Sequence, residues 1–286
     1  MLCAVGDLIE DIVVQLHGDI NRDTDTPAAI TRRRGGSAAN VAYFAAKLSG
    51  RSRFVGCVGD DPLGDSLIAQ LSQHGVDVRG ERHGRTGSIV VVATTDGNRT
   101  MLTDRGSATE LQHCAPEWLD GVRVLHVPLY SFSNEPLRAS TTAAVRFART
   151  TGATVSIDLS SVALIEHLGA PAVQALLNDV SPDVLFCTRS EADAVGVSRS
   201  QRFSARQVVV KDGAHPIRVL ANDGTEQTFA VDAHPEVVDS TGAGDAFAAG
   251  FLTALRNGGA IDECVEQGRT LAARVVMLPG ATLESQ

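Results

Sequence analysis

Aromatic residues are scarce in this sequence, where Phe, Trp and Tyr together make up 4% of 286 residues. Alanine, valine and glycine are plentiful instead, which favours a layered α/β core. Basic residues are also few, because 34 acidic residues outnumber 25 Lys and Arg and give a formal net charge of −9. We therefore expect neither broad nucleic-acid binding nor attachment to an anionic membrane.

Long apolar runs and paired cysteine motifs are absent as well. The first apolar stretch reaches Asp7 too early for a signal peptide, and no apolar segment is long enough to cross a bilayer. The five cysteines form no C-x-x-C motif and are scattered at Cys3, Cys57, Cys114, Cys187 and Cys264. This spacing indicates reduced thiols in a cytoplasmic protein, with Cys3 and Cys57 as small core residues.

Two common phosphate-binding motifs are missing. The P-loop motif G-x-x-x-x-G-K-[ST] occurs nowhere, so the chain is not a P-loop protein. A possible G-x-G-x-x-G fingerprint begins at Gly242, but Phe247 stands where its third glycine is required. The dinucleotide-binding interpretation therefore fails.

The sequence does contain a glycine-rich turn that leads into a helix, at residues 239–252. Gly242 and Gly244 leave backbone N–H groups accessible, and the start of a helix attracts phosphate. Asp245 lies in the same first turn, and we interpret it as the base that accepts a proton from a hydroxyl attacking a phosphoryl group. The alternative is an ordinary N-terminal helix acid beside ordinary turn glycines.

The order of the predicted elements indicates an α/β fold. Short apolar strands alternate with helices in the second half of the chain, at 122–127, 154–158, 184–187 and 207–211. Such alternation predicts a mainly parallel sheet covered by helices on both faces. Residues 12–34 and 84–108 are instead rich in β patterns, and an Asp-Gly pair within 95–98 predicts a hairpin. We expect a single domain over 1–286, with those two segments forming a small separate sheet.

Polar residues follow the first strand and precede the first helix. Asp11 is predicted near a strand's C-terminal end, where open α/β sheets bind ligands and a carboxylate can hold sugar hydroxyls. Gly35 and Gly36 allow close approach of a ligand to the backbone, and Asn40 offers a donor and an acceptor. The alternatives are a solvated loop and a packed asparagine. We interpret the run Arg32–Arg34 as a solvated rim.

Four elements of the chain, taken in order, resemble the ribokinase-like (PfkB) family of carbohydrate kinases. They are Asp11, Gly35-Gly36 with Asn40, Glu191, and Gly242-Ala-Gly-Asp245. The resemblance extends from residue 5 to about residue 281. It implies a ribokinase-like three-layer α/β/α core, with residues 12–34 and 84–108 as a β-sheet lid over the sugar and as a homodimer interface.

The resemblance also implies roles for individual residues. Asp245 would be the catalytic base, with Gly242, Ala243 and Gly244 supplying the backbone anion hole. The sugar would be bound by Asp11, Gly35, Gly36, Asn40 and Arg105. Ser37 stands where ribokinases have a lysine that contacts ribose, so ribose itself is not the expected substrate.

The nucleotide side follows from the same resemblance, which implies ATP and Mg²⁺ as cofactors. The ATP-binding residues would be Lys211, Gly213, Thr188 and Arg269, with Thr188 replacing the family's asparagine. Glu191 would be tied to Mg²⁺. Asp239, Thr241 and the loop 279–281 would enclose K⁺ or another monovalent cation.

The predicted function is therefore ATP-dependent phosphorylation of a primary hydroxyl of a small sugar or sugar acid. One alternative is an adenosine-type nucleoside kinase on the same fold, although scarce aromatics leave few rings to stack on a base. Another is a non-catalytic sugar-binding regulator, against which the intact segment Gly242–Asp245 argues. Residues 97–108 resemble the lids of 2-keto-3-deoxygluconate kinases, and an acidic sugar would require cations such as Arg105 or Arg32–Arg34.

Overall fold

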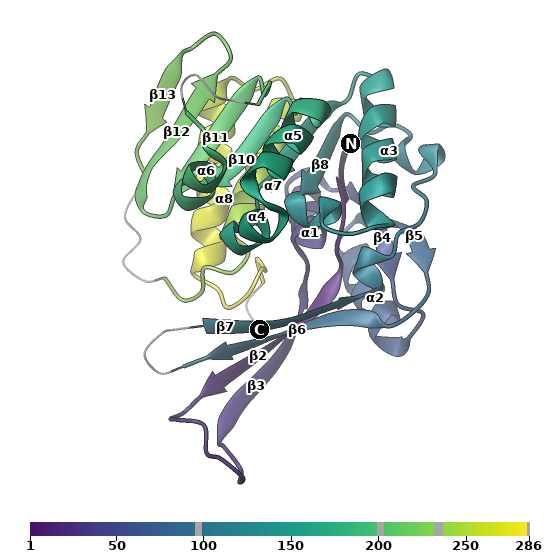
Figure 1. The fold of residues 1–286 in the computed structure, drawn as a ribbon, viewed down its shortest axis with the longest axis vertical. Coiled ribbons are helices and arrows are strands. Elements are labelled where there is room, and N and C mark those ends of the chain that lie inside the picture. Colours follow the sequence, from purple (N-terminus) through teal and green to yellow (C-terminus); the bar gives the residue numbers. More distant parts are fainter. Residues whose placement is uncertain (95–98, 199–202, 232–236, 285–286) are drawn as a thin grey trace.

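The computed structural model describes residues 1–94, 99–198, 203–231 and 237–284. Its main sheet has nine strands, which run in spatial order as β13 (Glu226–Phe229), β12 (His215–Ala221), β11 (Gln207–Asp212), β10 (Val184–Thr188), β9 (Thr154–Asp158), β8 (Val124–Pro128), β1 (Leu2–Val5), β4 (Ser52–Val58) and β5 (Val76–Arg82). Adjacent strands from β11 to β5 are parallel, whereas β12 and β13 are antiparallel additions at one edge. The predicted mainly parallel sheet is therefore confirmed (Figure 1).

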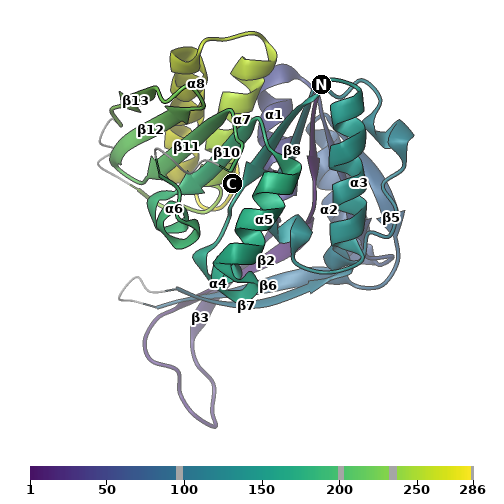
Figure 2. The ribbon, with the colours of Figure 1, turned by 45° about the horizontal axis from the view of Figure 1, so that its top comes forward.

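Helices cover both faces of this sheet. One face carries α1 (Ser37–Ser49), α2 (Pro62–Gln73), α7 (Ala243–Arg256) and α8 (Ile261–Val276), and the other carries α3 (Leu137–Thr150), α4 (Val162–Leu168), α5 (Ala170–Val180) and α6 (Arg189–Val195) (Figure 2). Short 3₁₀ turns span η1 (Ser107–Thr109), η2 (Pro116–Leu119) and η3 (Leu129–Phe132).

Strand β1 shows why the core has three layers. Leu2 and Ala4 pack into the apolar cluster on one face of the sheet, while Cys3 and Val5 pack into the cluster on the other. Alternating side chains buried on both faces are typical of a parallel sheet between two helix layers. All five cysteines are free and buried, and no described helix is long and apolar enough to span a membrane.

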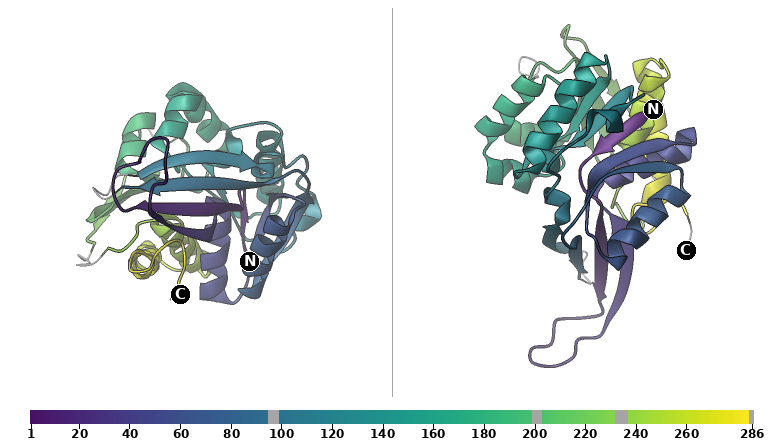
Figure 3. Two further views of the ribbon diagram at one scale, coloured as in Figure 1. Left: turned by 90° about the horizontal axis from the view of Figure 1, so that it is seen from below. Right: turned by 90° about the vertical axis from the view of Figure 1, so that its right-hand side faces the viewer.

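A second, smaller sheet is built from the two segments that the sequence predicts as a lid, and we call it the lid. Its order is β3 (Ala28–Gly35), β2 (Ile9–Leu16), β6 (Thr86–Ala93) and β7 (Arg99–Gly106). It lies across one end of the main sheet, and its β2–β3 hairpin projects from the body (Figure 3). Strands β6 and β7 pair antiparallel as a hairpin requires, although the predicted turn at 95–98 lies outside the described residues. Strands β12 and β13 of the main sheet also pair antiparallel, as a hairpin does.

Candidate active site

Helix α7 begins at the glycine-rich turn. Its N-cap Gly242 has a φ of 78°, and a Cβ there would lie 2.4 Å from the Cβ of Ala281, so only glycine fits. The N–H groups of a helix's first turn lack partners within the helix and attract anions. The N–H of Ala243 already donates to the carbonyl of Ser240 at 3.2 Å. Gly244, among the predicted anion-hole residues, and Asp245, which follows it, are therefore better placed as N–H donors than Ala243.

The Asp245 carboxylate lies against the start of α1. Ser37 Oγ donates to its Oδ1 at 2.7 Å, and Asn40 Nδ2 donates to its Oδ2 at 2.8 Å. Helix α1 can begin so close because Gly36 has a φ of 98°, and a Cβ there would collide with the carbonyl of Asp7. Burial raises the pKa of Asp245 to about 7 against the opposing effect of its two hydrogen bonds. Such a carboxyl group is matched to proton transfer near neutral pH.

The contacts of Asn40 differ from its predicted role in sugar binding. Its amide nitrogen donates to Asp245, and its Oδ1 accepts a hydrogen bond from Arg34 Nη1 at 2.6 Å. It still lines the cavity in which a sugar would bind, but the contacts described make it a positioning residue for Asp245. Ser37 shares that task, whereas the resemblance marked its position only for contact with the sugar.

A cavity of about 390 Å³ lies between the inner face of the lid and the starts of α1 and α7. Asp11 projects into it from β2, and a Cβ on the nearby Gly35 would lie 2.3 Å from the Asp11 carboxylate. Burial, followed by the nearby Asp7, raises the pKa of Asp11 to about 6. Arg105 also lines the cavity, where its Nη1 pairs with Asp7 Oδ2 at 2.6 Å and its guanidinium covers the ring of Tyr130 at 3.8 Å.

The prediction that Arg32–Arg34 form a solvated rim is wrong for two of the three residues. Arg32 is exposed and pairs with Glu10 on the outer face of the lid. Arg33 and Arg34 line the cavity under the lid, and the Arg34 guanidinium also donates to the carbonyl of Ala281 at 3.1 Å. A charged run does not predict this difference, because neighbouring side chains of a strand such as β3 point to opposite faces of the sheet. Arg34 also faces the cavity because β3 ends there and the chain turns into α1.

A second cavity, of about 450 Å³, lies on the other side of the α7 turn. It is lined by the residues predicted to bind the nucleotide, Thr188, Lys211, Gly213 and Arg269, and most of its remaining wall is apolar. Arg269 lies at the rim, where it donates to the carbonyl of Ala230 at 2.7 Å and pairs with a glutamate of its own helix. The sequence-predicted nucleotide residues therefore share one cavity.

Asp158, at the end of β9, was missed by the sequence analysis. Its Oδ2 accepts a hydrogen bond from Lys211 Nζ at 2.7 Å. Glu191 is buried nearby and forms a capping box with Thr188, whose backbone N–H donates to Glu191 Oε2 at 2.7 Å. Burial, followed by repulsion from Asp158, raises the pKa of Glu191. A divalent cation beside these two carboxylates would relieve that repulsion, so the residues fit the predicted Mg²⁺.

The predicted monovalent-cation residues also lie together, but a charged side chain accompanies them. Asp239 Oδ1 accepts hydrogen bonds from the Thr241 N–H and hydroxyl, and Oδ2 accepts one from the Gly280 N–H. The Nη1 of Arg33 lies 3.9 Å from Asp239 Oδ2. A Cβ on Gly280 would approach that Nη1 to 2.6 Å. Arg33 thus supplies a positive charge at the predicted cation site, which does not fit the binding of a further cation there.

The two cavities meet at the first turn of α7. Ser240, Ala243 and Gly244 line the second cavity, while Gly242 and Asp245 line the first. A ligand in either cavity can therefore reach the same short stretch of backbone. Such an arrangement brings a donor and an acceptor molecule together across one anion-binding turn.

Comparison with known proteins agrees with this geometry. The family model described as "pfkB family carbohydrate kinase" matches residues 1–286. Fructokinase-2 of Zea mays is 31% identical over 271 residues, which cover 88% of this chain and 79% of that protein. The 5-dehydro-2-deoxygluconokinase of Photobacterium profundum is 27% identical over 280 residues, which cover 89% and 83%.

Solved structures share the fold. The crystal structure of adenosine kinase from Sinorhizobium meliloti superposes with a TM-score of 0.85 at 24% identity, covering 98% of this chain and 94% of that one. The predicted ribokinase-like fold with a separate small sheet is confirmed, and so is the prediction of an ATP-dependent sugar kinase. The chain belongs to the pfkB family of carbohydrate kinases.

Proposed function

We propose that this kinase transfers the γ-phosphoryl group of ATP to a primary hydroxyl of a small sugar or sugar acid, with Asp245 as the base. The observation that carries the proposal is the shared wall between the two cavities, formed by the turn from Ser240 to Asp245. The sugar lies in the lid cavity and ATP lies in the cavity lined by Lys211. Each substrate stays in its own cavity, and the phosphoryl group is transferred where the two cavities meet at the turn.

Each residue of the turn has a defined task. Asp245 accepts the proton of the attacking hydroxyl, since its raised pKa gives it a proton affinity suited to that step. The N–H groups of Gly244 and Asp245 stabilise negative charge on the phosphoryl group as it is transferred. Lys211 adds positive charge on the nucleotide side, and its pairing with Asp158 keeps its Nζ directed toward the turn.

Mg²⁺ would be held by Glu191 and Asp158, the buried acidic pair of the nucleotide cavity. When bound, it neutralises charge on the ATP phosphates. The Lys211–Asp158 pair and the Thr188–Glu191 capping box fix the positions of both carboxylates before any substrate arrives. The chain's own contribution is therefore preorganisation of this acidic pair.

We also propose that Arg33 makes the enzyme independent of K⁺. Activity should be unchanged when K⁺ is replaced by tetramethylammonium at constant ionic strength. Arg33→Met should lower kcat about tenfold, the effect of losing one interaction worth ~1.4 kcal/mol, and should create a response to K⁺. Arg32→Met is the matched control because Arg32 is exposed on the outer lid face. Clear activation of the unaltered enzyme by K⁺ would contradict this assignment.

The charges of the lid cavity bear on the substrate class. Arg105 is paired with Asp7 and Arg33 with Asp239, whereas the hydrogen-bond acceptors of Arg34 are the neutral Asn40 amide and the Ala281 carbonyl. Arg34 is therefore the cation best able to bind the carboxylate of a sugar acid. A panel of fructose, other neutral sugars, 2-keto-3-deoxy sugar acids and adenosine tests the function through ADP release. Phosphorylation of none of the sugars or sugar acids would overturn the proposal.

The nucleoside alternative has less support. Tyr130 is the only aromatic residue among the described residues that line the lid cavity. The Arg105 guanidinium already covers its ring at 3.8 Å. A purine base would have to displace that arginine from both Tyr130 and Asp7 in order to stack.

The homodimer through the lid stays a prediction, as does the cytoplasmic location. Exposed apolar side chains on the outer face of the lid support the proposed dimer, since Ile30 and Leu102 are 63% and 58% exposed there. The buried, free cysteines agree with a reducing compartment.

A further inference from the structure

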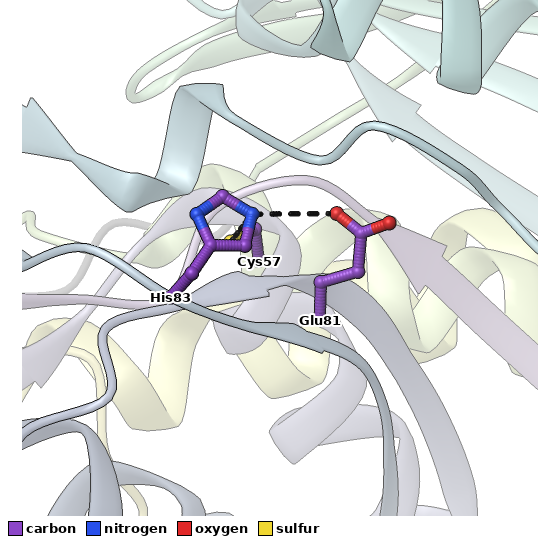
Figure 4. A group of neighbouring side chains, drawn as sticks. All are labelled: Cys57, Glu81 and His83. Carbon is purple, nitrogen blue, oxygen red and sulfur yellow. Dashed lines mark hydrogen bonds and ion pairs between the residues drawn. The ribbon is translucent and has the colours of Figure 1, made fainter.

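Cys57, Glu81 and His83 form a cluster of metal-ligating side chains at the edge of the main sheet, away from the two cavities (Figure 4). One candidate ligand atom from each residue lies within 4.8 Å of the others. Cys57 Sγ is 3.3 Å from His83 Nε2, which is 3.5 Å from Glu81 Oε2. In tetrahedral zinc sites with bonds of 2.0–2.3 Å, ligand atoms are separated by about 3.3–3.8 Å. The two separations that involve His83 Nε2 therefore already match the spacing of a zinc site.

Strand register produces this cluster. Cys57 of β4 and Glu81 of β5 are direct partners in a parallel pair, so their side chains emerge on the same face of the sheet. His83 follows Glu81 by two residues, and its backbone N–H donates to the carbonyl of Val58 at 3.3 Å. The extended backbone thus brings all three side chains to one side without a special loop.

The surrounding groups resemble the outer shell of a metal site. The second ring nitrogen of His83, Nδ1, lies 3.3 Å from Glu110 Oε2. Metal-bound histidines commonly have a carboxylate on the nitrogen that does not bind the ion, which fixes the ring orientation. The Glu81 carboxylate is held by the backbone N–H groups of Gln112 and His113 at 2.8 and 3.0 Å. Each oxygen keeps a further lone pair for a metal.

We propose that Cys57, His83 and Glu81 bind one Zn²⁺ ion, with the fourth coordination position open to water. The thiolate and imidazole ligands suit Zn²⁺ and disfavour Mg²⁺, which prefers oxygen ligands alone. The buried Cys57 lies beneath the partly exposed His83 and Glu81, so an ion enters from the solvent side. Binding exchanges the Cys57 thiol proton for the metal–sulfur bond and releases that proton to solvent.

The position suggests what the ion does. His83 lies in the short connection between β5 of the main sheet and β6 of the lid, and Glu110 follows η1, which continues from β7 of the lid. A metal bond from His83 to Cys57 and Glu81 would tie the base of the lid to the main sheet. Zn²⁺ is therefore expected to stabilise the folded protein without taking part in phosphoryl transfer.

The test uses tag-free, full-length protein that has been treated with a chelator. It is titrated with Zn²⁺, with Mg²⁺ as the hard-ion control and Co²⁺ as a spectroscopic probe. Calorimetry should show one Zn²⁺ per chain, the thermal midpoint should rise, and Co²⁺ should give a thiolate charge-transfer band. Cys57→Ser should weaken Zn²⁺ binding by about 100-fold or more. Cys114→Ser, a buried cysteine in the same apolar cluster, should bind as the unaltered protein does.

His83→Gln keeps the test informative if Cys57→Ser does not fold, because the His83 side chain is 36% exposed. It should lose Zn²⁺ binding, whereas His17→Gln in the lid should retain it. Failure of the unaltered protein to bind Zn²⁺ stoichiometrically would overturn the proposal. So would a Co²⁺ complex without the thiolate band, or equal binding by His83→Gln and His17→Gln.

Discussion

Asp245→Asn should lower kcat by about 100-fold or more while ATP and sugar still bind, because the base is lost and the binding groups remain. The substitution fits the local hydrogen bonds. Asparagine can accept from Asn40 through its oxygen, and its amide can donate to the Ser37 hydroxyl after that hydroxyl rotates. Initial rates by coupled assay and ATP affinity by calorimetry provide the measurements.

The thermal stability of Asp245→Asn also distinguishes a catalytic base from an ordinary acid at a helix N-terminus. Because folding raises the pKa of Asp245, the folded protein binds a proton more readily than the unfolded chain. Stability therefore falls as pH rises from about 4 to about 7, and the loss persists above that range. Asp245→Asn should raise the thermal midpoint at pH 8.

Asp262 provides the matched control for Asp245. It is an exposed acid in the first turn of α8, and Asp262→Asn should leave kcat unchanged and slightly lower the thermal midpoint. If Asp245→Asn behaved in the same way, Asp245 would be an ordinary helix-terminal acid, as the alternative interpretation of the sequence held.

Asp11→Ala should raise the KM for the sugar by about 100-fold or more and change kcat far less. A carboxylate that accepts hydrogen bonds from two hydroxyls loses two charge-assisted interactions, each worth about 1.5–3 kcal/mol. Asp11 lines the lid cavity from β2, whereas Asp245 lines it from the first turn of α7. Its loss therefore weakens sugar binding without removing the base.

Glu10 provides a control from the same strand. It points to the opposite face of the lid, where it pairs with Arg32. Glu10→Gln should leave the sugar KM unchanged, while both variants should retain the KM for ATP. An unaltered sugar KM in Asp11→Ala would remove Asp11 from the sugar site, whatever its effect on kcat.

The elements that the sequence predicts well are those specified by local pattern. The turn and helix at Gly242–Asp245, the lid strands and the βα alternation all follow from glycine positions and apolar periodicity. The short helix α4 was not predicted, because seven residues provide too little periodicity.

The residues that sequence reasoning missed depend on contacts between distant segments. Asp158 reaches Lys211 across 53 residues, and Ser37 reaches Asp245 across 208. The charged run around Arg34 indicates a solvated residue, whereas its hydrogen bonds to Asn40 and to the distant Ala281 carbonyl draw it into the cavity wall. Such contacts are fixed by strand order and by the docking of the lid, which no short motif records.

The central claim is that Asp245 must be ionised before phosphoryl transfer can occur. Its most direct test is the pH dependence of kcat/KM for the sugar at saturating ATP, measured from pH about 5 to about 9. We predict that kcat/KM rises with pH and that this rise has an apparent pKa near 7. The same rise should be seen in an Asp11→Asn variant, which lacks the group whose pKa is about 6. A profile that is flat across this range, or whose limb disappears with Asp11, would contradict the assignment of Asp245 as the base.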